Sequence, residues 1–143
     1  MEIEIIKNSI LVIRDMKVIL DFELAKMYGI ETKRLKESVR RNSKRFPIDF
    51  MFELSQEEWL TLRTQFATSR WGGQRYAPFA FTEQGIAMLS SVLNTDRAIE
   101  VNISIMRAFV LMRQWALNHQ ELSKRLDALD NNTGRNSRTL NRY

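Results

Sequence analysis

The sequence lacks cysteine altogether and contains a single histidine, His119. Disulfide bonds, thiolate zinc sites and cysteine nucleophiles are therefore excluded, and so is any catalytic site that needs two histidines. Because these absences remove many common catalytic arrangements, we expect a protein that is not an enzyme and that carries no cofactor or metal.

Long apolar runs are also missing. The longest stretch without a charged residue is the twelve residues 84–95, whereas a membrane span needs roughly 20 apolar residues. Two of the first four residues are acidic, whereas a secretory signal begins with positive charge. We expect a soluble, cytoplasmic protein without membrane contact.

The composition is that of a folded domain. The chain has 143 residues, of which 44% are hydrophobic and 27% are charged. This length is enough for one domain, and the hydrophobic content lies well above that of disordered chains. We expect one self-sufficient globular domain.

Positive charge is concentrated in three segments. Residues 31–45 contain seven basic and two acidic residues, whereas residues 59–82 and 131–143 each contain three arginines and no acid. Since the net charge of the chain is only +5, the remainder is net negative. Local basic segments on an acidic body are typical of polyanion-binding proteins, although a solvated helix face gives the same pattern. The basic residues of the first segment are Lys33, Arg34, Lys36, Arg40, Arg41, Lys44 and Arg45.

The first residues predict a β-hairpin. Ile3 and Ile5 alternate with acids, turn-forming residues follow at 7–9, and residues 10–13 are rich in β-branched side chains. Period-2 alternation and a turn between two such runs favour paired strands.

Two short helices are expected next. Asp21 is the expected N-cap of a helix at 22–28, which Gly29 ends. Thr32 is the expected N-cap of a second helix that continues to Asn42. Two helices joined by a short turn containing glycine form a helix-turn-helix layout.

The second of these helices has a packing face and an exposed face. At about 100° per residue, Leu35, Ser38, Val39 and Asn42 cluster on one side and leave the basic residues on the other. Lysine and arginine on such a helix can contact guanine or phosphates in the DNA major groove. Glu37 can accept from cytosine N4 or can pair with Lys33 or Arg41. The expected DNA contacts are Thr32, Lys33, Arg34, Lys36, Arg40, Arg41, Lys44, Arg45, Arg70 and Arg75.

The middle of the chain predicts a strand, a helix and a loop. Residues 50–54 favour a strand, and Ser55 followed by Glu58 is a capping box that opens a helix toward Phe66. The loop at 67–78 has a Gly-Gly tip with arginines and aromatic residues around it. It suits a wing laid along DNA, or a structural hairpin whose Trp71 and Tyr76 close the core.

A short strand at 79–81 and two further helices follow. Thr82 is the expected cap of a helix to about Leu93, and Asp96 of a last helix without proline or glycine until Gly134. Together with the hairpin, these elements predict an α+β fold, a small helix-turn-helix-like domain that ends in a long C-terminal helix.

The last helix has one continuous apolar seam with the 3-4 spacing of a coiled coil. Up to Leu117 a second stripe, Ile99, Ile103, Met106 and Val110, predicts a central core helix, and beyond it only the seam remains. We expect a homodimer through residues 115–130 of this seam, or else a segment that folds back or frays, and the expected dimer contacts are Trp115, His119, Leu122, Leu126 and Leu129. We therefore divide the chain into a DNA-binding domain at 1–117, a helical extension at 118–130 and a disordered basic tail at 131–143. The seam consists of Ala98, Val101, Ile105, Ala108, Met112, Trp115, His119, Leu122, Leu126 and Leu129.

Two other groups of residues carry weaker hypotheses. His119 lies on the apolar seam, which favours a packing role over a catalytic one. Asp49, Glu53, Glu57 and Glu58 are the carboxylates that a magnesium-dependent nuclease would need. Glu57 and Glu58 begin a predicted helix, however, where acids are expected from the helix dipole alone.

Several motifs occur together in the order found in a known family. The chain resembles the ORF-six N-terminal domain family of the KilA-N superfamily over about residues 10–115. The matching segments are Val18-Ile19-Leu20-Asp21, Glu23-Leu24-Ala25, Tyr28-Gly29-Ile30-Glu31-Thr32-Lys33-Arg34-Leu35, Arg45-Phe46-Pro47, Asp49-Phe50-Met51-Phe52, Gly72-Gly73, Arg75-Tyr76, Pro78, Phe81-Thr82-Glu83-Gln84-Gly85, Met88-Leu89 and Ile105-Met106-Arg107-Ala108-Phe109.

The resemblance implies a small α+β DNA-binding domain of phages, large DNA viruses and bacterial mobile elements, often found in antirepressor-like proteins. We therefore expect a transcriptional regulator or antirepressor-like module that binds double-stranded DNA as a homodimer. The alternative is a protein-binding module whose basic face meets an acidic repressor or host factor.

Overall fold

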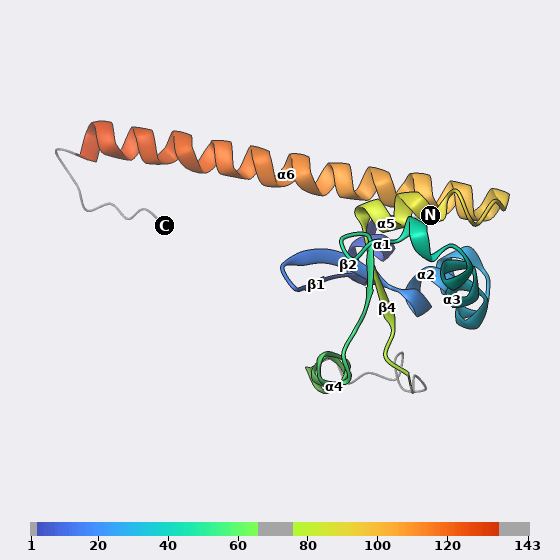
Figure 1. Ribbon diagram of the computed structural model, residues 1–143. Coiled ribbons are helices and arrows are strands. Elements are labelled where there is room, and N and C mark those ends of the chain that lie inside the picture. The colour runs from blue at the N-terminus through green and yellow to red at the C-terminus, as the bar shows by residue number, and fades with distance from the viewer. Residues whose placement is uncertain (1–2, 66–75, 135–143) are drawn as a thin grey trace. The chain divides into compact units, whose positions relative to one another are not determined.

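The computed structural model describes residues 3–65 and 76–134, and the expected α+β class is confirmed (Figure 1). The chain divides into two compact units, Met1–Met106 and Arg107–Tyr143. The elements of the described residues are α1 (Ile3–Ser9), β1 (Ile10–Ile13), β2 (Met16–Leu20), α2 (Asp21–Tyr28), α3 (Thr32–Arg41), the 3-10 helix η1 (Ser43–Arg45), β3 (Met51–Glu53), α4 (Gln56–Gln65), β4 (Phe79–Thr82), α5 (Glu83–Leu89) and α6 (Asp96–Gly134).

The four strands form one antiparallel sheet in the order β1-β2-β4-β3. β1 and β2 form a hairpin in which Ile13 pairs with Met16. The two turn residues, Arg14 and Asp15, both have left-handed backbones, with φ of 55° and 62°. This is the type I′ geometry that matches the twist of paired strands.

The N-terminal hairpin prediction is wrong in its position. Residues Ile3–Ser9 form a helix, and the hairpin lies one element later, at 10–20. Ile6 is fully buried, and the Ser9 hydroxyl donates to the Glu23 carboxylate at 3.0 Å. These contacts with the rest of the fold override a period-2 pattern too short to exclude a helix.

The helix-turn-helix layout is confirmed. α2 packs on β2 and β4, and α3 packs on α2 (Figure 1). Gly29 ends α2 with φ of 74°, a left-handed conformation that glycine adopts without steric cost. Asp21 is the first residue of α2 and does not cap it, because its carboxylate accepts instead from the N–H of Phe79 at 2.9 Å. Similarly, Thr32 begins α3, and Glu31 occupies the cap position.

The start of α5 lies close to the backbone of Phe50, the residue before β3. Thr82 caps α5 as expected, its hydroxyl accepting from the N–H of Gly85. A Cβ at Gly85 would lie 1.9 Å from the carbonyl oxygen of Phe50, so only glycine fits there. α5 ends at Leu89, before the expected end at Leu93.

The start of α6 differs from expectation in two ways. The hydroxyl of Thr95 accepts from the N–H of Ala98, so Thr95 rather than Asp96 is the cap. The second apolar stripe is not part of a core, because Ile99 and Ile103 are 42% and 45% exposed. The helix continues to Gly134 and so includes residues 131–134, which we had placed in the tail.

A buried polar network joins α2, α5 and α6. The Tyr28 hydroxyl donates to the side-chain oxygen of Asn102 at 2.5 Å. The amide nitrogen of Asn102 donates to the carbonyl of Ile86 and to the hydroxyl of Ser90. Burial raises the pKa of Tyr28, which keeps its hydroxyl protonated as a donor.

Candidate nucleic-acid interface

Helix α3 is held in place by two fully buried side chains. Leu35 and Val39 are 0% and 1% exposed, and they lie on the side of the helix that we predicted to pack. Burying a leucine and a valine contributes about 1.5 to 3 kcal/mol each relative to exposure. The opposite side of α3 is therefore fixed as a solvent-facing surface.

Four cations occupy that surface. Lys33, Arg34, Arg40 and Arg41 are all exposed, which confirms the predicted exposed face for these residues. Glu37 lies among them, and its carboxylate is 3.7 Å from the guanidinium of Arg41. The pairing that we considered for Glu37 is thus present, in an exposed geometry that contributes little stability.

Lys36 is a correction to the predicted exposed face. Its side chain is only 15% exposed, and its ammonium lies 3.4 Å from the carboxylate of Asp21. The same ammonium donates to the carbonyl of Ala77 and lies 5.0 Å from the ring centre of Phe79. Lys36 therefore fastens α3 to the beginning of β4 and is not presented on the exposed face.

Asp21 is the carboxylate that receives this lysine. It is 1% exposed, and burial raises its pKa above the usual range, although the Phe79 N–H and Lys36 act against the rise. The buried ion pair therefore ties α3 to α2, and the hydrogen bond from the Phe79 N–H to the same carboxylate ties the helix-turn-helix to β4.

The remaining predicted contacts lie beside α3 or outside the described residues. Lys44 and Arg45 are exposed on η1. The guanidinium of Arg40 lies 5.4 Å from the ring centre of Phe79, so one flank of α3 meets the start of β4. Arg70, Arg75 and the expected wing up to residue 75 fall within 66–75, outside the part of the chain that the structure describes.

The other flank of α3 borders an open groove of about 640 Å³. Its lining includes Lys33, Arg34 and Arg41 from α3, Glu31 and Glu37, and residues 92–95 between α5 and α6. We did not predict the contribution of Asn94 and Thr95. Nothing in the local sequence indicates it, because the groove forms between segments more than 50 residues apart.

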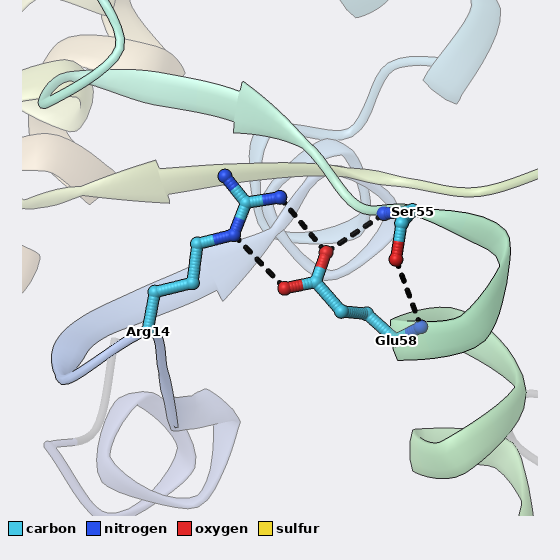
Figure 2. Close-up of polar contacts among 3 residues, drawn as sticks. All are labelled: Arg14, Ser55 and Glu58. Carbon is cyan, nitrogen blue, oxygen red and sulfur yellow. Dashed lines mark hydrogen bonds and ion pairs between the residues drawn. The ribbon is translucent and has the colours of Figure 1, made fainter.

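A second ion pair fastens α4 to the first hairpin (Figure 2). Both hydrogen bonds of the predicted capping box are present, from the Ser55 N–H to Glu58 and from the Glu58 N–H to the Ser55 hydroxyl. The guanidinium of Arg14 donates two hydrogen bonds of 2.9 Å to the same Glu58 carboxylate. The Arg14 guanidinium, followed by the Ser55 N–H, lowers the pKa of Glu58 to about 2.

The carboxylates considered for a nuclease have no shared site. Glu58 is taken up by Arg14 and Ser55, and across residues 3–65 and 76–134 no three metal-ligating side chains come together. In the same residues, no helix combines the length and the apolar character needed to cross a membrane.

The distal part of α6, in the second unit, exposes its apolar seam. Trp115, Leu122, Leu126 and Leu129 are between 43% and 67% exposed. The ring of His119 stacks on that of Trp115, with a centre-to-centre distance of 4.9 Å. The seam predicted for dimerisation is thus a solvent-facing stripe on a continuous helix.

One known protein family matches the part of the chain that contains α3. Residues 8–92 match the ORF6N domain, and this range contains α2, α3, β3, β4 and α5 in full. No curated protein and no solved structure matches the chain. The matched range covers more than half of the sequence and agrees with the resemblance found from its motifs. The chain therefore belongs to the ORF6N domain family.

Proposed function

We propose that this protein is a DNA-binding regulator that inserts α3 into the major groove of double-stranded DNA. The observation that carries the proposal is the set of four exposed cations on α3, backed by the buried Leu35 and Val39. A helix presented in this way can place basic side chains against phosphates and base edges.

Two further features support the proposal. The chain has a helix-turn-helix layout, and its resemblance to the ORF6N family implies DNA binding of the kind found in phages and mobile elements. The described residues hold no cluster of metal-ligating groups, which suits a protein that binds DNA without cutting it. The same family resemblance supports a transcriptional or antirepressor-like role.

The test is binding to random duplex DNA at several salt concentrations. If about five phosphates are neutralised, the logarithm of affinity falls with the logarithm of salt at a slope of roughly −4.5. Arg34→Ala and Arg40→Ala each weaken binding and reduce the slope by about 0.9 if the lost contact is to a phosphate. Lys17→Ala, which removes an exposed charge from β2, is the control. A slope near zero would contradict DNA binding.

We also propose that two copies pair through the distal seam of α6. A second copy carries the same stripe, and pairing it would remove Trp115, Leu122, Leu126 and Leu129 from water. Sedimentation of a Leu122→Glu, Leu126→Glu double variant is expected to give a monomer where the natural chain gives a dimer. Lys124→Glu, an exposed change off the seam, should leave the dimer intact.

A protein-binding module is the second candidate. Tyr76 is 77% exposed and adjoins Ala77, the residue whose carbonyl accepts from Lys36 on α3. Exposed aromatic side chains are enriched at protein interfaces. Such a module would leave random duplex unshifted at moderate salt, whereas a DNA-binding protein forms at least non-specific complexes.

A further inference from the structure

The groove beside α3 has the position that DNA docking requires. A B-DNA major groove is about 12 Å wide, and an α-helix with its side chains is about 10 to 12 Å across. A helix in that groove is therefore bordered on each side by a sugar–phosphate ridge. A ridge can lie beside the helix only where the protein leaves room for it.

One flank of α3 offers this room and the other does not. Toward β4, Lys36 and Arg40 lie against Phe79, so that flank is filled by protein. Toward the α5–α6 connection, the groove of about 640 Å³ separates α3 from residues 92–95. A phosphate ridge can enter on this second side.

The walls of the groove carry suitable donors. Lys33, Arg34 and Arg41 line it from α3, and Asn94 and Thr95 are exposed on the facing wall. The Thr95 hydroxyl accepts from the N–H of Ala98, so its own hydrogen remains available to an outside acceptor. Amide and hydroxyl donors opposite cationic side chains are common partners of DNA phosphates.

We propose that this groove seats one phosphodiester strand of the DNA, with Lys33, Arg34 and Arg41 on one side of it and Asn94 and Thr95 on the other. This inference rests on the proposed DNA binding and adds an interface segment, residues 92–95, that lies mostly beyond the matched family range. It also assigns Lys33, Arg34 and Arg41 to the phosphates.

Two carboxylates in the groove limit its affinity for a polyanion. Glu37 pairs with Arg41 at 3.7 Å, and Glu31 is exposed at the cap position of α3. Both would repel phosphates that approach without a compensating donor. The three cations and two carboxylates of the lining leave the groove with a net charge of +1.

Opposite charge changes at Asn94 test the proposal. Asn94→Lys should add a phosphate contact, tighten binding to duplex DNA several-fold and steepen the salt slope by about 0.9. Asn94→Asp should weaken binding several-fold. An acid just ahead of α6 is favourable to a helix N-terminus, so this loss would not reflect unfolding, and thermal unfolding of both variants verifies that.

The matched controls are Asn8→Lys and Asn8→Asp on α1, an exposed asparagine outside the groove lining. Binding to a random 20-base-pair duplex is measured for all five proteins. Asn94 variants that shift affinity no more than the Asn8 variants would overturn the groove assignment and leave DNA binding intact. A natural chain that forms no complex would overturn both.

Discussion

Helices α3 and α4 are each fastened to the sheet region by a cation, a carboxylate and an aromatic ring. For α3, Lys36 pairs with Asp21 at 3.4 Å and lies over the ring of Phe79 in β4. For α4, Arg14 pairs with Glu58 at 2.9 Å and lies 4.1 Å from the ring centre of a β3 phenylalanine. The same three groups thus occur twice, once buried and once near the surface.

Burial reverses the effect of acid on the two carboxylates. The pKa of Glu58 is lowered to about 2, so its stabilising contribution is present above pH 4.5 and is lost as the pH falls toward 2. The pKa of Asp21 is raised, so its contribution is present at low pH and is lost as the pH rises through its folded pKa. The Arg14–Glu58 pair near the surface therefore stabilises the fold through the charged form of Glu58. The buried Lys36–Asp21 pair mainly gives partners to polar groups that folding has already removed from water.

The largest difference between the two pairs should appear when the cation is removed. Lys36→Met leaves Asp21 buried without its counter-ion and should lower the free energy of unfolding by about 3 kcal/mol. Lys33→Met, an exposed change on the same helix, should stay within about 0.5 kcal/mol. Urea unfolding followed by circular dichroism measures both, and equal values would show that the buried pair has no special weight.

A smaller loss is expected at the α4 cap. Ser55→Ala removes the hydroxyl that accepts from the Glu58 N–H and should lower the free energy of unfolding by about 1 kcal/mol. Thr64→Ala, an exposed change in the last turn of α4, is the comparison. If Ser55→Ala were neutral, the Arg14 guanidinium and the backbone N–H of residue 55 would be enough to hold Glu58 in place.

The smallest expected effect is the acid dependence of Glu58. In the natural chain, stability should decline as the pH falls from 4.5 toward 2, by less than about 1 kcal/mol from this group because the pair is partly exposed. In Glu58→Gln this part of the decline is absent, so the two unfolding curves converge at low pH. A constant gap between them from pH 7 to pH 2 would contradict the lowered pKa.

Signals that act between neighbours in sequence could be predicted. Gly29, the Ser55–Glu58 capping box and the buried face of α3 each depend on residues within one or two helical turns. Consequently the helix-turn-helix, which carries the candidate site, followed from the sequence.

Partners distant in sequence could not be predicted. The pattern around Asp21 is that of an N-cap, but the carboxylate is used by a backbone N–H 58 residues away. Lys36 was predicted to be exposed because a helical wheel of α3 contains no information on Asp21 or Ala77, the two residues that its ammonium contacts in the folded chain. The groove at Asn94 is also formed only by the folded chain.

The network around Asn102 sets the alignment of α6 in the first unit. Its amide oxygen and nitrogen together satisfy groups on α2 and α5. Sliding α6 by one turn, about 5.4 Å, would place an apolar residue opposite these polar groups and strand them without partners. Asn102 therefore fixes one position of α6 along its own axis, whereas the apolar stripe of the helix alone would allow several positions.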